Sequence, residues 1–131
     1  MPKARTGPSL LTPLELQIME VLWSSGPGTV AEVQERLASP LAYTTVATML
    51  GVLLRKKKVR RTPFGRSYRY QAAVTRKSAI GAALGDLVGR VFGGSSDALL
   101  VAMVDTNQLD LEALERAADL LRQRDADEGE T

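Results

Sequence analysis

Apolar residues recur at helical spacing in three segments of the first half of the chain, residues 12–23, 29–37 and 42–57. In each segment they fall on one face of a 3.6-residue helix, which predicts a buried stripe. The first stripe consists of Leu14, Ile18, Val21 and Leu22. The third consists of Val46, Met49, Leu50, Leu53 and Leu54. Capping boxes, Thr12 with Glu15 and Thr29 with Glu32, mark the starts of the first two helices.

From Val59 the period of the pattern changes to two, which is typical of strands. Residues 59–62 and 67–71 predict two short strands joined by Pro63-Phe64-Gly65-Arg66. Three helices followed by a basic β-hairpin predict a winged helix-turn-helix. Tyr68 and Tyr70 share one strand face, and we expect them to pack in the core of the hairpin rather than to stack on a ligand.

Residues 75–122 predict three further helices with apolar stripes, the first capped by Thr75 and the last by Asp110. A module of this size is too small to bury its apolar stripes by itself. We therefore expect it to pair with a second copy. Packing against the winged helix is the alternative. The residues expected to dimerise are Ile80, Leu84, Leu87, Val88, Val91, Phe92, Leu99, Leu100, Met103, Leu114 and Leu121.

The expected fold is therefore mainly α with a small β-hairpin wing, a winged helix-turn-helix followed by a helical dimerisation module. Its expected parts are a flexible arm (1–11), the DNA-binding domain (12–73), the dimerisation domain (74–122) and an acidic tail (123–131). Met1 to Pro8 has no apolar segment typical of a signal peptide, and no stretch is long enough to span a membrane. We expect a cytoplasmic protein.

Charge is divided unevenly between the two halves. Residues 1–85 hold 13 Lys/Arg and 4 Asp/Glu, a net +9, whereas residues 86–131 hold 4 Lys/Arg and 11 Asp/Glu, a net −7. No acidic residue lies between Glu35 and Asp86, where 11 Lys/Arg occur. A basic first domain of this kind favours nucleic acid as its partner.

Catalytic chemistry finds little support in the composition. The chain has no Cys and no His, which excludes disulfides, thiol nucleophiles and imidazole bases. It also has no phosphate-binding glycine loop and no G-x-S-x-G motif. We therefore expect no enzyme and no cofactor or metal.

A helix-turn-helix places its recognition helix in the major groove, with its first residues nearest the bases. Here these are Tyr43, Thr44, Thr45 and Thr48, which offer hydroxyl and methyl contacts to bases but no bidentate arginine. Basic residues around the helix end and the wing are expected to contact phosphates. They are Arg55, Lys56, Arg60, Arg66 and Arg69.

Three collinear runs, LTPLELQIMEVLW (11–23), AYTTVATML (42–50) and RSYRYQAAVTRK (66–77), resemble the penicillinase-repressor family of the BlaI/MecI type. The resemblance implies a homodimer that represses β-lactam resistance or cell-wall genes by binding palindromic double-stranded operators. It implies that Tyr43, Thr44, Thr45 and Thr48 belong to the recognition helix, and Arg66 and Arg69 to the wing. It also implies a membrane sensor protease as a partner, which relieves repression by cleaving the dimerisation module.

The chain departs from the family pattern at three places. Val52 stands where the family has an arginine, and Lys57 stands where it has a glycine that makes the turn after the helix. The family's cleavable pair corresponds here to Ala102-Met103. The missing arginine keeps a second function open, that of a winged-helix adaptor that binds proteins without specific DNA readout.

Overall fold

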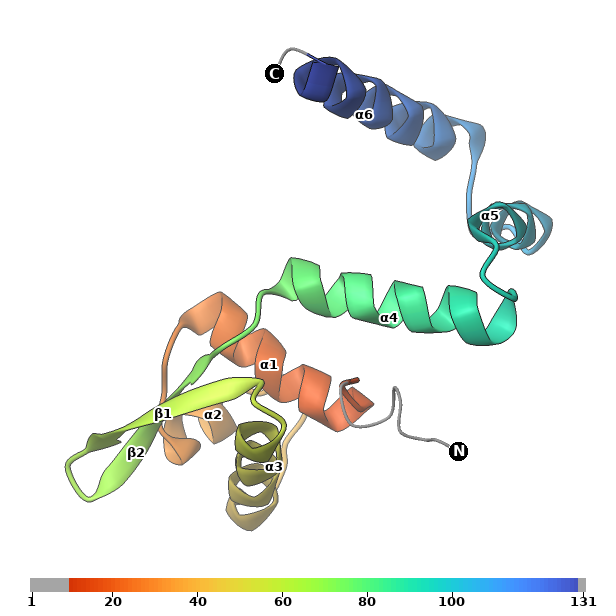
Figure 1. The fold of residues 1–131 in the computed structure, drawn as a ribbon. Helices are drawn as coiled ribbons and strands as arrows, with labels where there is room; N and C mark the ends of the chain where they lie inside the picture. The colour runs from red at the N-terminus through yellow and green to blue at the C-terminus, as the bar shows by residue number, and fades with distance from the viewer. Residues whose placement is uncertain (1–9, 130–131) are drawn as a thin grey trace. The chain divides into compact units, whose positions relative to one another are not determined.

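The structure is a computed structural model that describes residues 10–129 and divides into two compact units, Met1–Asp86 and Leu87–Thr131. Residues 1–9 of the expected arm and residues 130–131 of the expected tail lie outside the described residues. The elements are α1 (Pro13–Ser25), α2 (Val30–Arg36), α3 (Tyr43–Arg55), β1 (Val59–Phe64), β2 (Ser67–Ala72), α4 (Arg76–Val91), α5 (Ser96–Asp105) and α6 (Leu111–Gly129) (Figure 1).

Local sequence signals determine where the first two helices begin. The Thr12 hydroxyl accepts from the backbone N–H of Glu15, whose carboxylate accepts from the backbone N–H of Thr12. Thr29 and Glu32 repeat the same reciprocal pair at the start of α2. Both predicted capping boxes are thus confirmed, and each satisfies two backbone donors that a helix start leaves without a partner.

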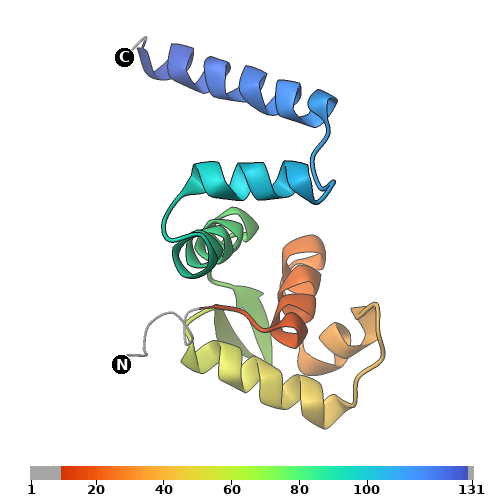
Figure 2. The same cartoon turned by 90° about the vertical axis from the view of Figure 1, so that its right-hand side faces the viewer.

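The core of the first unit lies between α1, α2, α3 and the hairpin, which Figure 2 shows gathered together. Its fully buried side chains include Ile18, Met19, Val33, Val46, Leu50 and Leu53. The predicted stripe of α1 is wrong at its first position, because Leu14 is 39% exposed while Glu15 is only 3% exposed. At the start of α1 the residue that faces the core is therefore Glu15 instead of the predicted Leu14, and the core boundary contains a charged side chain there.

β1 and β2 form an antiparallel hairpin in which Val59 pairs with Ala72 and Phe64 pairs with Ser67. Both strands are longer than predicted, so the connection shortens to Gly65 and Arg66. Gly65 adopts φ +62°, a conformation that favours glycine and suits a tight hairpin turn. On its other edge β2 forms a bridge to the segment before α2, with two backbone hydrogen bonds between Tyr70 and Gly28. This is the predicted winged-helix arrangement.

The prediction for the two wing tyrosines is half right. Tyr70 is buried in the core, with 6% of its surface exposed, whereas Tyr68 is 42% exposed. Both side chains are on the same face of β2, but the core ends between them.

The start of α4 is tied to α1 by three contacts within the first unit. The Trp23 indole N–H donates to the Val74 carbonyl at 2.9 Å, and Arg76 forms an ion pair with Glu20. The Arg76 guanidinium also lies 5.3 Å from the centre of the Trp23 ring. The predicted cap of α4 is confirmed, because the Thr75 hydroxyl accepts from the backbone N–H of Ser78.

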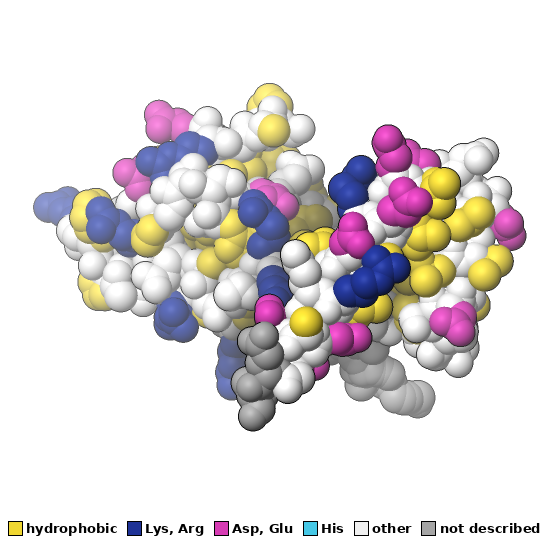
Figure 3. All heavy atoms as spheres, turned by 90° about the horizontal axis from the view of Figure 1, so that it is seen from above, with side chains coloured by type: hydrophobic (Ala, Val, Ile, Leu, Met, Phe, Trp, Pro, Cys, Tyr) yellow, Lys and Arg dark blue, Asp and Glu magenta, His cyan; other side chains and the backbone are white. Residues whose placement is uncertain are grey.

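Among the described residues of α4, α5 and α6, none is buried. Hydrophobic side chains gather on the right of Figure 3, over α5 and α6, with acidic side chains among them. α6 continues to Gly129 and so includes residues that were expected in the acidic tail. Within residues 10–129 no single helix is long and apolar enough to cross a membrane, and α4 with α5 meets that test only as a pair bent by 89°.

Candidate nucleic-acid interface

α3 packs one side into the core and presents the other to solvent. The exposed side carries Tyr43, Thr44 and Thr48, with Arg55 at the helix end, and Thr45 is half-buried beside them. Tyr43 has 51% of its surface exposed. Threonine hydroxyls donate and accept hydrogen bonds, and their methyl groups pack against the thymine methyl. The predicted base-reading residues therefore share one accessible surface of one helix.

The start of α3 differs from the starts of α1 and α2. Its N-cap residue is Ala42, which provides no side-chain hydrogen bond, and its first turn contains no acidic residue. The first backbone N–H groups of the helix thus lack a side-chain acceptor from the cap. A helix start of this kind favours an anion, because its N–H groups and the helix dipole both present positive charge.

Lys56 is held within the protein. Its Nζ donates to both carboxylate oxygens of Glu15, at 2.8 and 3.0 Å, and to the Leu10 carbonyl at 3.2 Å. An ammonium group has three protons, and these three contacts account for all of them. The predicted DNA contact of Lys56 stays a prediction, but its charge is already balanced by a carboxylate.

Glu15 is the buried partner of this pair. Burial by itself raises the pKa of Glu15, but the hydrogen bonds from Lys56 and from the backbone of Thr12 outweigh it. The net result is a pKa below the ordinary value, so Glu15 is ionised at neutral pH. The ion pair thereby joins the start of α1 to the residue that follows α3.

The turn after α3 keeps the geometry that a glycine would give it. Lys57 adopts φ +65°, and the backbone N–H of Lys58 donates to the Leu53 carbonyl at 2.9 Å. A non-glycine residue in this left-handed region bears a strain of about 1 kcal/mol. The departure from glycine therefore changes the charge and the strain of the turn but not its shape.

A shallow depression of about 580 Å³ opens where this turn meets the hairpin. Its lining is half aliphatic and half basic. The lining residues are Leu54, Lys57, Val59, Arg60, Arg61 and Ala73. It connects the end of α3 with the base of the wing.

Two arginines of the wing lie on aromatic rings, one on each face of the hairpin. The Arg61 guanidinium carbon is 3.8 Å from the centre of the Tyr68 ring, and that of Arg69 is 3.9 Å from the centre of the Phe64 ring. Arg61 Nη1 also donates to the Tyr70 hydroxyl at 3.4 Å, which raises the pKa of Arg61 above its ordinary value. Arginine stacks well on aromatic faces, and such contacts orient the guanidinium.

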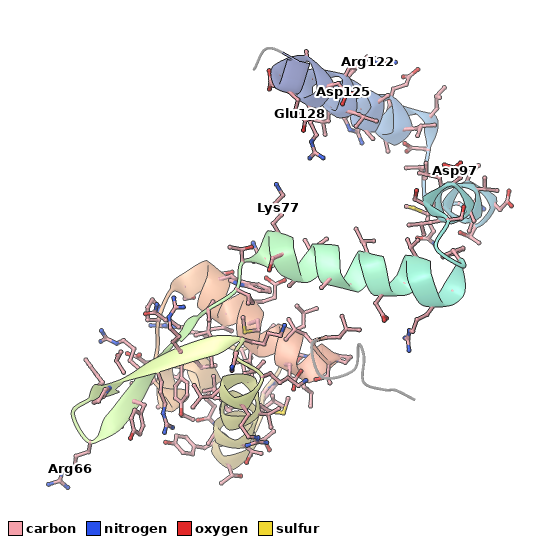
Figure 4. The ribbon with its side chains drawn as sticks, in the orientation of Figure 1. Arg66, Lys77, Asp97, Arg122, Asp125 and Glu128 are labelled. Atoms are coloured by element: carbon pink, nitrogen blue, oxygen red, sulfur yellow. The ribbon has the colours of Figure 1, made fainter. Side chains whose placement is uncertain are left out.

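The other predicted wing residues lie on exposed positions. Arg60 is exposed on β1, on the face opposite to Arg61. Arg66 follows Gly65 at the tip of the wing and extends away from the hairpin in Figure 4. Arg69 is half-buried, and its charge helps to lower the pKa of Glu32 after the larger effect of the Thr29 backbone hydrogen bond.

Three of the four acidic residues before Asp86 are engaged inside the first unit. Glu15 binds Lys56, Glu20 pairs with Arg76, and Glu32 accepts from the backbone of Thr29. Their negative charges are therefore engaged by helix caps and ion pairs. The wing itself, residues 59–72, contains four arginines and no acidic residue, although Glu32 of α2 interacts electrostatically with Arg69.

The residues predicted for dimerisation lie on α4, α5 and α6. Seven are exposed, namely Ile80, Leu84, Leu87, Val91, Leu100, Leu114 and Leu121. Four are half-buried, namely Val88, Phe92, Leu99 and Met103. Ala102 and Met103, the predicted cleavage pair, are both half-buried within α5.

Sequence reasoning counted Arg61 only as part of the general basic charge of the wing and missed its contacts with Tyr68 and Tyr70. The strand alternation places Arg61 and Tyr68 on one face, and this signal could have found their contact. The ion pair of Lys56 left no such signal, because Glu15 is 41 residues away in sequence.

Comparison with known proteins identifies a family, a related regulator and two solved structures that are similar to this chain. The penicillinase repressor family matches residues 11–123. The transcriptional regulator BlaI of Mycobacterium tuberculosis (strain CDC 1551 / Oshkosh) is 36% identical over 109 residues, 79% of each chain. The DNA-binding domain of the repressor BlaI is 26% identical with a TM-score of 0.48, over 58% of this chain and 90% of that domain. The complex structure of hsRosR-S4 matches 95% of this chain and 97% of that chain, with 16% sequence identity and a TM-score of 0.53. At this identity the similarity shows the fold alone.

Proposed function

Since this chain belongs to the penicillinase repressor family of DNA-binding transcriptional regulators, which are not enzymes, we propose that it represses genes as a homodimer on a palindromic operator. The observation that carries the proposal is the exposed side of α3, where Tyr43, Thr44 and Thr48 stand together on a helix fixed by the core. Such a protein works in the cytoplasm, where it can reach its operator DNA.

The proposed binding divides into base contacts and phosphate contacts. The threonines of α3 lie in the major groove and read base edges, and Arg55, Arg60, Arg66 and Arg69 contact phosphates. Val52, which stands where the family pattern has an arginine, is half-buried and uncharged. This chain therefore lacks the DNA contact that the arginine would make. Specificity then depends on two half-sites and on the shape of the DNA more than on any one side chain.

The exposed apolar side chains of the C-terminal helices support the proposed dimer. Leu111, Leu120 and Val91 keep 69, 66 and 63% of their surface exposed. Pairing with a second copy of the module is the simplest way to bury so many exposed apolar side chains. The two recognition helices of a dimer would then match the two halves of a palindrome.

We further propose that the regulated genes concern β-lactam resistance or the cell wall, and that a membrane sensor protease relieves repression. The proposed cleavage at Ala102–Met103 requires α5 to open first. The Ala102 carbonyl accepts from both the backbone N–H and the hydroxyl of Thr106, at 3.0 and 2.7 Å. A protease binds extended backbone, so these contacts must break before the bond can be cut.

A titration of DNA by the full-length protein tests the proposal. The probes are a palindromic duplex selected from a random-sequence pool, the same duplex with one half-site scrambled, and an unrelated duplex of equal length. We expect tight binding of the palindrome, loss with the scrambled half-site, and weaker binding of every probe at 200 mM than at 50 mM salt. Binding that ignores both sequence and salt would favour the adaptor and refute the repressor.

A further inference from the structure

Arg61 stands out as a cation that is fixed in place before any ligand binds. Its guanidinium lies 3.8 Å from the centre of the Tyr68 ring, and its Nη1 donates to the Tyr70 hydroxyl at 3.4 Å. Tyr70 is buried and therefore a rigid anchor, whereas Tyr68 is 42% exposed yet has its ring covered by the guanidinium. A side chain held from two sides loses little rotamer freedom on binding a ligand.

The register of the hairpin shows which way this cation faces. Arg61 pairs with Tyr70, and Val59, two residues earlier, pairs with Ala72. Residues two apart on a strand share a face, and this face carries the buried Val59 and Tyr70 of the core. Arg61 therefore emerges on the side of the wing that packs toward the helices, next to the end of α3.

A second cation reaches the same place from the other element. Lys57 lines the depression together with Arg60 and Arg61, over an aliphatic floor that includes Leu54 and Val59. Lys57 does so from φ +65°, a conformation that favours glycine. The chain thus keeps a charged side chain at a position where a smaller residue would relax the backbone.

We infer that Arg61 and Lys57 form a seat for one backbone phosphate of duplex DNA at the junction of α3 and the wing, and that Tyr68 and Tyr70 are positioning residues for Arg61. The inference rests on the proposed function. A guanidinium carries five N–H donors, so the contact to Tyr70 leaves donors for a phosphate oxygen. The seat is shallow and open where the turn after α3 meets the hairpin, which suits a phosphate within a duplex better than an enclosed small molecule.

The test uses the full-length protein and the selected palindromic duplex described above. Arg61→Ala should weaken binding about tenfold and lower the slope of log K against log salt by about 1.8, which is about 0.9 for the one seat in each of the two half-sites. A scan of the duplex with single methylphosphonate linkages should find one phosphate in each half-site whose neutralisation weakens the wild type but not R61A. Arg116→Ala, on α6, removes the same charge and serves as the matched control.

The tyrosines need a readout that a general structural role would not move. Tyr68→Leu should weaken binding about two- to fivefold, and Tyr68→Phe, which keeps the ring, should bind like the wild type. In the R61A background Tyr68→Leu should have no further effect on binding. Circular dichroism should show equal helix content in all these variants.

Three results would overturn the seat. If R61A matches R116A in affinity and slope while the palindrome is still bound selectively, the phosphate contact is refuted and the proposed function stays intact. If Tyr68→Leu weakens R61A as much as the wild type, the positioning role is refuted. If inorganic phosphate protects the wild type against heat more than R61A while both bind DNA alike, the seat binds a small anion instead. A wild type that binds no duplex selectively refutes the proposed function itself.

Discussion

Lys56, which follows α3, and Glu15, in the first turn of α1, form an ion pair with Nζ–O distances of 2.8 and 3.0 Å. Only 18% of the Lys56 side chain and 4% of the Glu15 side chain are exposed. A pair removed from water to this degree is costly to break, because the remaining charge has no compensation. The pair is therefore a structural link between the two helices.

Lys56→Ala should mainly destabilise the protein. We expect the free energy of unfolding to fall by roughly 2–4 kcal/mol, because Glu15 stays buried without its partner. Urea unfolding measures this loss. Affinity for DNA, measured well below the unfolding midpoint, should change no more than in Arg116→Ala. A large loss of affinity at unchanged stability would instead establish Lys56 as a phosphate contact.

The pH dependence of stability should reflect Glu15. Its pKa lies below the ordinary value in the folded protein, and the unfolded chain has about the ordinary value of 4.5. The stabilisation is therefore fully present above pH 4.5 and is lost as the pH falls through the lower, folded pKa. Glu15→Gln should reduce the decrease in the free energy of unfolding between about pH 5 and about pH 3, because the substituted side chain no longer titrates. Glu35→Gln, on the exposed side of α2, is the control and should leave the fall unchanged.

Features that depend on residues close in sequence were predictable, whereas those that depend on distant residues were not. The capping boxes at Thr12 and Thr29 were predictable because each involves residues three apart. The burial of Glu15 was not, because its partner Lys56 is distant in sequence, and a hydrophobic stripe assigned the place to Leu14. Tyr68 was misplaced for a related reason, since alternation gives the face of a strand but not the point at which the core ends.

Thr48→Ala should reduce the discrimination between operator and unrelated DNA. Loss of one hydroxyl and methyl contact in the major groove should lower the ratio of affinities by about three- to tenfold. Binding of unrelated DNA should stay the same, because phosphate contacts are untouched. The control is Thr62→Ala, which removes an exposed threonine from β1. If both substitutions lower discrimination equally, α3 is not the helix that reads the bases.

Lys57→Gly should change stability and binding in opposite directions. Relief of the left-handed conformation should raise the free energy of unfolding by about 0.5–1 kcal/mol. Loss of the charge should weaken binding of all duplexes by a similar factor. Urea unfolding and DNA titration at one salt concentration measure the two effects. Lys58→Gly, at the next position and without a positive φ, should bring no gain in stability.

Leu121→Glu should convert the proposed dimer into a monomer. Leu121 is 58% exposed on α6, so a charge there costs a single chain little, whereas an apolar interface would have to bury it without a partner. Sedimentation equilibrium should show a dimer for the wild type and a monomer for Leu121→Glu at the same micromolar concentration. Gln123→Glu adds the same charge two residues further along α6 and should remain dimeric.

The DNA affinity of Leu121→Glu follows from the same reasoning. A monomer binds the half-sites independently and loses the advantage of joined recognition helices, so the palindrome should bind little better than a duplex with one half-site scrambled. Circular dichroism should show the helices of the first unit intact. A folded protein that stays dimeric with Glu at position 121 would place the interface elsewhere than on this face of α6. A wild type that sediments as a monomer would remove the dimer from the proposed function altogether.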